Sequence, residues 1–369
     1  MKKIKIFFAS LLTLALLTGC TNEKQLTKYD MQSTDLGFDT IIMFSAFSED
    51  EATFKRYQSM VEEDFRYYDQ LFDKYHTYDT INNIKTINDA AGKHAVKVDQ
   101  ALLDLLLLSK HYDDLSNHQF SITMGSVLNI WHDAREQATA HPDNIKLPSI
   151  ETLKEANKAT GWDHIEIDEK ARTVFIKEAK TQLDVGAIAK GYAVEKIAQK
   201  LEKAGLEHGL INAGGNVRLI GSKPEGMPWS VGLQIPNIDE YETDSLVSIL
   251  IDESASFVTS GDYQRYFEYE GQLMHHIIDP ETLMPARHCR SVTVITKDSG
   301  IADMLSTTLF TMSYDDGVKF IEAIKAELNT PIEAIWVFDD RAPAQTDNVT
   351  SIKGYDVAMS DGVKDMLKK

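Results

Sequence analysis

The apolar residues that follow position 50 recur with the spacing of a helix. They lie three or four positions apart, at Phe54, Tyr57, Val61, Phe65, Tyr68 and Phe72. This spacing predicts a long amphipathic helix that begins after Ser48 and follows an apolar strand over 37–47. Asp99 is expected to cap a second helix, whose nearly continuous leucines at 102–108 predict burial on most sides. Ser149 is expected to begin a third, shorter helix.

Short apolar segments separated by turns dominate the second half of the chain. The pattern predicts a hairpin over 164–167 and 173–177, a helix from Lys190 to near Gly205, and helices over 301–313 and 315–328. The other predicted strands are 209–212, 217–221, 229–234, 246–251, 264–269, 273–278, 291–297 and 332–338. Strands grouped together with helices set apart predict an α+β fold. We expect residues 35–369 to form one compact catalytic unit, in one lobe or two.

The N-terminus has the pattern of an export signal. Three lysines precede the apolar residues 6–17, which are too few for a comfortable transmembrane helix. Leu17-Thr18-Gly19-Cys20 then resembles the bacterial lipobox, in which the cysteine is acylated; the alternative is an ordinary secretory signal with a chance cysteine. We predict a signal peptide over 1–19, lipidation of Cys20 and a flexible tether over 20–34. The protein is then anchored by lipid on the extracytoplasmic face of the cell membrane.

The strongly acidic composition limits the partners of the protein. The formal net charge is −19, and a signal peptide with three lysines and no acidic residue leaves the mature chain close to −22. This charge disfavours nucleic acid and anionic lipid headgroups, so membrane contact is expected only through the lipid anchor. The single further cysteine, Cys289, excludes an internal disulfide, and we favour a buried thiol over a nucleophile.

A glycine-containing segment over 183–192 precedes a predicted helix. Gly186 and Gly191 let the backbone approach a phosphate, and a helix N-terminus favours the anion. The Walker lysine is absent, so the segment is no P-loop. The alternative is a strand-to-helix turn with a solvated Lys190.

Two further segments are candidates for ligand contact. Gly214 and Gly215 allow either a close approach of the backbone to a ligand or a tight hairpin turn. The sequence contains no GxGxxG motif, so a Rossmann dinucleotide site is not supported. His275 and His276 are adjacent in a predicted strand, so they point to opposite faces and should not chelate one metal together.

Asp303 and Thr307 are four residues apart on a predicted helix, so they share one face. A carboxylate and a hydroxyl are hard oxygen ligands that suit Mg²⁺, which usually keeps waters and adds phosphate oxygens. Asp and Thr at this spacing are commonplace and usually solvated, so a solvated helix face is the alternative.

Taken in order, these segments resemble the ApbE family of FAD:protein FMN transferases. The resemblance runs from about Gly37 to the predicted helix after Asp315, which is most of the mature chain. The matching blocks are Phe38-Asp39-Thr40, Lys74-Tyr75-His76-Thr77-Tyr78-Asp79, Phe120-Ser121-Ile122-Thr123-Met124-Gly125, Asp184 to Tyr192, Asn212-Ala213-Gly214-Gly215, Thr259-Ser260-Gly261-Asp262-Tyr263, His276-Ile277-Ile278-Asp279-Pro280, Ser291-Val292-Thr293-Val294, Ala302-Asp303 and Ser306-Thr307.

The resemblance implies an α+β fold of antiparallel sheets flanked by helices, with FAD as substrate, Mg²⁺ as cofactor and another protein as acceptor. A Thr or Ser hydroxyl of the acceptor attacks the FMN-side phosphorus of FAD, which forms a phosphoester and releases AMP. The implied metal ligands are Asp303, Thr307 and the backbone carbonyl of Ala187. The residues implied to contact FAD are Phe38, Tyr78, Thr123, Met124, Asp184, Lys190, Asn212, Gly214, His275 and His276. Lys190 is expected to donate to phosphate, Tyr78 to pack on a ring of FAD, and His276 or Asp184 to act as general base.

This chain departs from the family pattern at two places. The family commonly has Thr-Gly-Tyr-Pro where this chain has Thr282-Leu283-Met284-Pro285, and often Met-Gly-Thr where it has Phe38-Asp39-Thr40. Both departures concern the flavin edge of the site more than the metal ligands.

Three other functions remain open from the sequence. They are a flavin-binding electron-transfer lipoprotein, an FAD pyrophosphatase that uses water, and a substrate-binding lipoprotein of a transporter. The strand-rich second half argues against the transporter protein. Acceptors of the family carry a motif of the type Asp/Asn-x-x-Thr/Ser-Gly-Ala-Thr, and the nearest segment here, 157–163, lacks the Ala-Thr end. The chain therefore resembles the donor enzyme and not a flavinylated acceptor.

Overall fold

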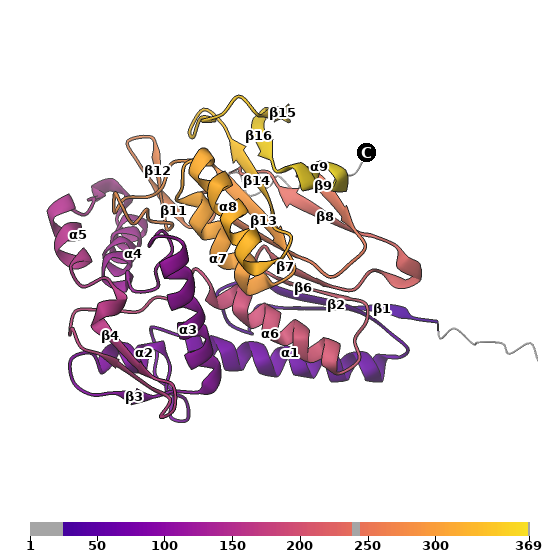
Figure 1. Ribbon diagram of the computed structural model, residues 1–369, viewed down its shortest axis with the longest axis horizontal. Coiled ribbons are helices and arrows are strands. Elements are labelled where there is room, and N and C mark those ends of the chain that lie inside the picture. The colour runs from indigo at the N-terminus through magenta and orange to yellow at the C-terminus, as the bar shows by residue number, and fades with distance from the viewer. Residues whose placement is uncertain (1–24, 238–243, 368–369) are drawn as a thin grey trace, which may run out of the picture.

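A large antiparallel sheet forms the centre of the molecule (Figure 1). The computed structural model describes residues 25–237 and 244–367. Among them, nine strands pair antiparallel in the order β1-β2-β6-β7-β10-β13-β14-β16-β15. Their bounds are β1 Thr27–Ser33, β2 Ile42–Ser48, β6 Gly209–Ala213, β7 Asn216–Ile220, β10 Ser256–Gly261, β13 Ser291–Thr296, β14 Glu333–Phe338, β15 Thr350–Ile352 and β16 Tyr355–Met359. The α+β fold of antiparallel sheets and flanking helices is confirmed.

Four helices cover one face of this sheet. They are α1 Glu51–Phe72, α6 Ala189–Lys203, α7 Ser299–Phe310 and α8 Tyr314–Leu328. The predicted apolar stripe of α1 is buried at Phe54, Tyr57, Val61, Phe65 and Phe72, because these side chains pack under β2 and against α6. The N-cap of α1 is Asp50, two residues after the predicted Ser48, and its side chain accepts a hydrogen bond from the Thr53 amide.

The opposite face of the sheet is covered by a hairpin and the last helix. β8 Trp229–Gln234 pairs with β9 Ser245–Ile251, and α9 Asp361–Met366 packs beside them. Apolar side chains from this hairpin meet the alternate residues of the sheet strands, such as Phe257 and Val337. Successive strand residues point to opposite faces, so this second cluster is separate from the one under the helices.

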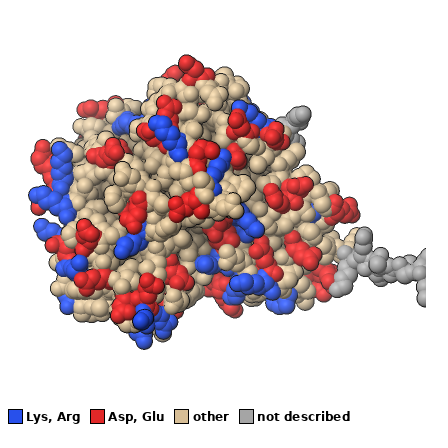
Figure 2. All heavy atoms as spheres, viewed as in Figure 1, with Lys and Arg blue, Asp and Glu red and all other residues tan. Residues whose placement is uncertain are grey.

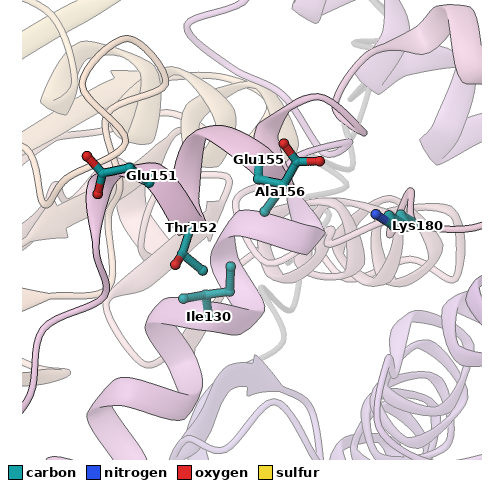
Figure 3. A pocket seen from close by; sticks show the side chains of 6 residues that line it. All are labelled: Ile130, Glu151, Thr152, Glu155, Ala156 and Lys180. Carbon is teal, nitrogen blue, oxygen red and sulfur yellow. The ribbon is translucent and has the colours of Figure 1, made fainter.

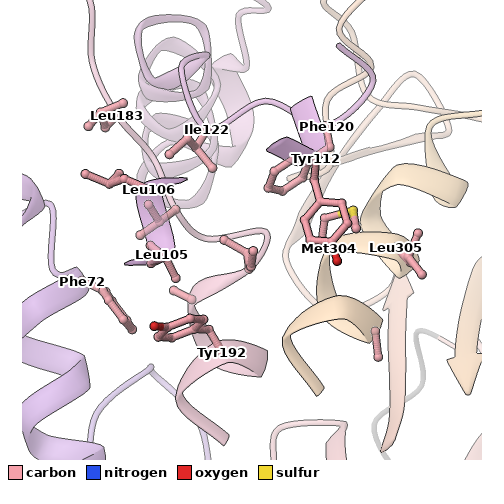
Figure 4. Packing of buried hydrophobic residues seen from close by; sticks show 14 of the residues in the cluster. Phe72, Leu105, Leu106, Tyr112, Phe120, Ile122, Leu183, Tyr192, Met304 and Leu305 are labelled. Atoms are coloured by element: carbon pink, nitrogen blue, oxygen red, sulfur yellow. The ribbon is translucent and has the colours of Figure 1, made fainter. Parts of the chain in front are cut away.

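A smaller lobe lies at one end of the sheet (Figure 1). Its elements are α2 Ile84–Asp89, β3 Val96–Lys97, α3 Gln100–Leu115, α4 Gly125–Ala140, α5 Ile150–Asn157, β4 Ile165–Asp168 and β5 Thr173–Ile176, with the hairpin β11 Tyr266–Tyr269 and β12 Gln272–His275. Asp99 caps α3 and Ser149 caps α5, as predicted. Figure 4 shows Leu105 of α3 near Tyr192 of α6, and Tyr112 of α3 near Met304 of α7, so one core joins the lobe to the sheet.

One prediction about a chain segment is wrong, and two helices were missed. Residues 20–34 are not all tether, because β1 lies within them and pairs with β2 from Thr27 to Ser33. The polar sequence concealed this strand, since only Met31 of the seven residues is buried. α2 and α4 were not predicted, because their apolar residues are too sparse to show a stripe.

No helix among residues 25–237 and 244–367 is long and apolar enough to cross a membrane. The predicted signal peptide and Cys20 lie outside these described residues. Cys289 is a buried free thiol, which is the interpretation that the sequence favours over a nucleophile. Figure 2 shows acidic side chains spread across the visible face with basic ones between them, in keeping with the net charge of −19.

Candidate active site

The candidate site forms where the N-terminal turn of α6 meets α7. The backbone amide of Gly191 donates to Oδ2 of Asp303 at 2.7 Å, which ties the two helices together. A Cβ atom at residue 191 would lie 2.3 Å from the Ser299 carbonyl oxygen and 2.4 Å from Asp303 Cβ. Only glycine therefore allows this approach of α6 to α7.

Asp303 and Thr307 lie one turn apart on the same face of α7, as their spacing predicts. The second carboxylate oxygen of Asp303 and the carbonyl of Ala187 have no hydrogen-bond partner among the residues that the structure describes. Thr307 Oγ1 lies 3.3 Å from the hydroxyl of Ser260 on β10. This mixed oxygen set suits a hard cation. No group of three or more His, Cys, Asp or Glu side chains in the described part of the chain is arranged for a metal.

Charge and burial oppose each other at Asp303 and Lys190. Burial raises the pKa of Asp303 to about 6, against the effects of the Lys190 ammonium and the Gly191 amide. Burial also lowers the pKa of Lys190, although the nearby Asp303 carboxylate favours its charged form. Lys190 is only partly exposed, and its Nζ lies 3.5 Å from the Gly214 carbonyl, so it is not a fully solvated lysine.

The segment around Gly214 and Gly215 is the turn of the β6–β7 hairpin. Both glycines have positive φ, +57° and +87°, as a two-residue hairpin turn requires. The side chain of Asn212 accepts from the Gly215 amide at 3.1 Å, so it stabilises the turn. The Gly214 carbonyl lies 3.5 Å from Nζ of Lys190, which places this turn at the candidate site.

A partly buried ion pair holds Asp184 in the segment before α6. Lys74 Nζ donates to Asp184 Oδ2 at 2.7 Å and to Asn129 Oδ1 at 2.9 Å. The Gly186 amide donates to the other carboxylate oxygen of Asp184. Burial favours the neutral acid, but the Lys74 charge and these hydrogen bonds keep the pKa of Asp184 below its ordinary value. Lys74 was not predicted as a site residue, although it begins one of the matching blocks.

The two adjacent histidines have different surroundings. His275 is buried, with Nε2 donating to the Ala286 carbonyl at 2.7 Å and Nδ1 accepting from the Ile277 amide at 3.3 Å. Its ring is therefore fully engaged by backbone, which argues against the predicted contact with FAD. His276 Nδ1 is buried and has no partner among the described residues. Burial, and then nearby positive charges, lower its pKa to about 3, so the ring is neutral at physiological pH.

Two arginines that sequence reasoning missed lie near His276. Burial is the largest cause of the lowered pKa of His276, and the charges of Arg265 and Arg135 lower it further. Burial also lowers the pKa of Arg135, and the charge of Arg265 adds to that effect. Arg265 lies just before β11 and Arg135 lies on α4, which packs against that strand. Because 130 residues of chain separate them, spacing could not reveal their proximity. Together with Lys190, they make the neighbourhood of His276 positive in a protein that is otherwise acidic.

The remaining predicted contacts with FAD differ in accessibility. Thr123 and Met124 are buried, and the Thr123 hydroxyl accepts from the Gly161 amide at 3.0 Å, which argues against contact of these two side chains with FAD. Tyr78 is partly exposed, and its hydroxyl donates to Asp73 Oδ2 at 2.9 Å. Phe38 is half-buried against Phe65.

The first departure from the family pattern has a conformational explanation. Gly37, Phe38 and Asp39 all have positive φ, at +100°, +58° and +48°. Asp tolerates the left-handed region better than most residues, so it can replace the family glycine at position 39. The Phe38 amide donates to Asp69 Oδ1 at 2.7 Å, which holds the turn in place.

The second departure places a leucine in glycine's conformation. Leu283 has φ +60°, and its buried side chain packs in a cluster with Trp131 and Phe267. We expect Leu283→Gly to lower the free energy of unfolding by about 2 kcal/mol, because removal of a buried leucine costs about 2–5 kcal/mol and relief of the left-handed conformation regains about 1–2 kcal/mol. Urea unfolding measures this change, and an unchanged or higher stability would show that backbone strain dominates.

A separate pocket lies between α4 and α5 (Figure 3). It has a volume of about 490 Å³ and is lined by Ile130, Glu151, Thr152, Glu155, Ala156 and Lys180. None of these residues belongs to the Asp303–Lys190 site, so the pocket has no part in the chemistry considered below.

Comparison with known proteins gives a consistent result. A family model described as the ApbE family matches residues 38–332. An FAD:protein FMN transferase of Klebsiella pneumoniae is 30% identical over 305 residues, which cover 81% of this chain and 86% of that protein. One from Vibrio cholerae is 28% identical over 318 residues, which cover 86% and 90%.

Solved structures agree with the fold. The crystal structure of the ApbE protein from Thermotoga maritima has a TM-score of 0.75 and 27% identity, and the match covers 93% of this chain and all of that one. The flavin transferase ApbE from Vibrio cholerae has a TM-score of 0.71 at 24% identity and covers 93% of this chain, which supports the fold alone.

Proposed function

The chain belongs to the ApbE family, and from this premise we propose how its site transfers the FMN part of FAD to an acceptor protein. The protein is an enzyme, an FAD:protein FMN transferase. The observation that carries the proposed mechanism is the set of oxygen atoms at Asp303, Ala187 and Thr307 near Lys190, of which one Asp303 oxygen and the Ala187 carbonyl have no hydrogen-bond partner among the described residues.

We propose that Mg²⁺ is held by the Asp303 carboxylate, the Thr307 hydroxyl and the Ala187 carbonyl. The fit rests on the two oxygens without partners and on the burial of Asp303, which makes a lone carboxylate there unfavourable unless a cation neutralises it. When bound, the ion supplies positive charge to the phosphate oxygens as negative charge builds up on the leaving AMP.

The reaction forms one oxygen–phosphorus bond and breaks another. A Thr or Ser hydroxyl of the acceptor bonds to the FMN-side phosphorus, the bond from that phosphorus to the oxygen of the AMP phosphate breaks, and AMP leaves with the bonding electrons. The hydroxyl proton passes to a base or to solvent. Lys190 is placed to donate to a phosphate oxygen, since its ammonium lies 3.5 Å from the Gly214 carbonyl and is close enough to Asp303 for that carboxylate to favour its charged form.

We propose His276 in preference to Asp184 as the group that receives the hydroxyl proton. Asp184 is committed to Lys74 and Gly186, and its lowered pKa makes it a poor base. His276 is neutral and has a free ring nitrogen. Its pKa of about 3 describes the protein alone, and the negative phosphates of FAD would raise it by offsetting the surrounding positive charges. Asp184 then positions Lys74 and the turn before α6.

The flavin and adenine contacts that we propose are fewer than the resemblance implies. Phe38 and Tyr78 remain, because both rings are partly accessible, and Gly214 remains through its backbone at the site. Asn212 contributes by holding that turn. The other three residues support the site from within the protein. His275 donates to the Ala286 carbonyl, Thr123 accepts from the Gly161 amide, and Met124 packs in an apolar cluster.

The proposed function is tested by acceptor labelling. The purified enzyme is incubated with FAD, Mg²⁺ and an acceptor bearing the family motif, and the acceptor is then measured by intact mass. An added mass of one FMN, lost when the motif Thr is changed to Val, supports transfer. AMP release without labelling, across several such acceptors, would favour the pyrophosphatase.

We propose that the mature protein is anchored to the extracytoplasmic face of the membrane by lipid on Cys20. The lipobox-like sequence Leu17-Thr18-Gly19-Cys20 supports this proposal. We expect Cys20→Ala to leave the protein released or retained as a precursor. Membrane fractionation with intact mass measures the outcome, and full retention of a mature, lipid-modified chain would contradict the proposal.

A further inference from the structure

We propose that Ile41 and Met43 form a docking surface for the acceptor protein, beside the transfer site. This inference rests on the proposed function, because only a protein acceptor requires such a surface. Ile41 is 48% exposed and Met43 is 38% exposed. Large apolar side chains with this exposure are few in the described chain, and the others are Tyr75, Ile150, Met227 and Val318. Ile41 and Met43 alone among the six lie two residues apart at one strand, so they expose a joint apolar surface.

Hydrogen bonds connect this surface directly to the site. The Ile41 carbonyl accepts from the Gly214 amide at 3.3 Å, and the Gly214 carbonyl lies 3.5 Å from Lys190 Nζ. Thr40 packs so closely on Gly214 that a Cβ there would lie 2.0 Å from Thr40 Oγ1. The backbone that carries the two exposed side chains is therefore linked to the Lys190 ammonium through a single tight turn at the end of the sheet.

The fold explains why these two side chains are uncovered. Ile42 and Phe44 of β2 point to the helices and are fully buried, while Met43 and its neighbours on alternate positions point to the other face. On that face the β8–β9 hairpin covers Phe47, whose ring lies 6.2 Å from that of Trp229. The hairpin cover does not extend to Met43. The uncovered part of the sheet face is thus the end nearest to the site.

The backbone beneath the surface is held in one conformation. The Phe38 amide donates to Asp69, and Met43 pairs across the strands with Asn212, which itself fixes the Gly214–Gly215 turn. A rigid apolar surface binds a partner with little loss of conformational freedom.

The occupant follows from the reaction. For an acceptor hydroxyl to reach the phosphorus, the chain on either side of it must cross the protein surface next to Lys190. There it meets isoleucine and methionine in a protein whose net charge is −19. We infer an acceptor segment with apolar residues flanking the modified hydroxyl.

The test is a cycle that combines an enzyme variant with two acceptor peptides. Both peptides carry the motif Asp-x-x-Thr-Gly-Ala-Thr, one flanked by leucines and the other by serines. The enzymes are the wild type and Ile41→Thr/Met43→Thr, in which threonine preserves strand propensity. We expect the wild type to show a KM at least about fivefold lower for the leucine-flanked peptide, and the variant to lose this preference. The KM for FAD and the labelling rate at saturating peptide should stay unchanged.

Met227→Thr is the matched control, because Met227 is 50% exposed but lies before β8, away from the site. It should keep the preference. Single Ile41→Thr and Met43→Thr variants replace the double variant if that one unfolds. An equal preference in wild type and variants overturns the inference, whereas absence of labelling by the wild type would instead count against the proposed function.

Two other occupants give distinct results. If the double substitution lowers binding of the unlipidated protein to phosphatidylglycerol vesicles and leaves the peptide preference intact, the surface contacts lipid. If it changes the sedimentation coefficient and leaves the preference intact, the surface contacts a second copy. Either result overturns the assignment to the acceptor.

Discussion

Replacing Asp303 by alanine is expected to lower the rate of FMN transfer by roughly 1,000-fold, because about 4 kcal/mol of charge stabilisation at the phosphates is lost with the metal. Asp303 is the carboxylate of the proposed ligand set, and its second oxygen is open. Thr307→Ala should cost less, since a hydroxyl brings a dipole and not a charge. The measurement is labelling rate against Mg²⁺ concentration for metal-stripped enzymes, in which high Mg²⁺ should partly rescue Thr307→Ala but not Asp303→Ala.

Asp303→Asn separates charge from packing. The amide oxygen of asparagine can still accept from the Gly191 amide, so the contact between α6 and α7 is kept while the charge is removed. We expect this variant to fold like the wild type and to be nearly as inactive as Asp303→Ala. Wild-type activity of either variant after metal stripping and Mg²⁺ addition would refute the assignment of the metal site.

Replacing Gly191 by alanine is expected to abolish most activity and to lower stability. The new Cβ would meet the Ser299 carbonyl oxygen at 2.3 Å and Asp303 Cβ at 2.4 Å, so the helices must separate and Asp303 must move. The overpacking costs about 1–3 kcal/mol, and the better helix propensity of alanine regains at most about 1 kcal/mol. Displacement of Asp303 then weakens Mg²⁺ binding, which the same titration of labelling rate detects.

Gly317→Ala is the matched control for this substitution. Gly317 also lies in a helix, α8, but a Cβ there meets only the flexible end of Leu309 at 3.3 Å and the Trp336 ring at 3.6 Å. It should keep near-normal activity and stability. If Gly191→Ala behaved like Gly317→Ala, the close contact of α6 with α7 would not be what positions Asp303.

Local sequence patterns predicted most helices and strands. The elements that these patterns missed depend on contacts between residues distant in sequence. The stripe of α1 and the cap of α3 at Asp99 depend on neighbouring residues, so the sequence shows them. The strand β1 escaped notice because it lies at the sheet edge with mostly polar, exposed side chains. Its position is determined by pairing with β2, which no local pattern records.

The site shows the same division. The shared helix face of Asp303 and Thr307 follows from a spacing of four residues. The ion pair of Lys74 with Asp184 joins residues that are 110 positions apart, and the contact of Gly191 with Asp303 joins residues that are 112 apart. Resemblance to the family identified segments but could not separate inward from outward side chains. Thr123 is an example: its segment matches the family pattern, but its side chain is buried inside the protein.

The central claim is that the enzyme uses the pyrophosphate of FAD as the activated donor. The most direct measurement is the intact mass of an acceptor after incubation with wild-type enzyme and Mg²⁺, with either FAD or FMN as the donor. FAD should add one FMN to the acceptor and release an equal amount of AMP. FMN should add nothing, because transfer from a monophosphate would have to expel hydroxide or oxide, a leaving group much poorer than AMP. Equal labelling of the acceptor from both donors would contradict the account.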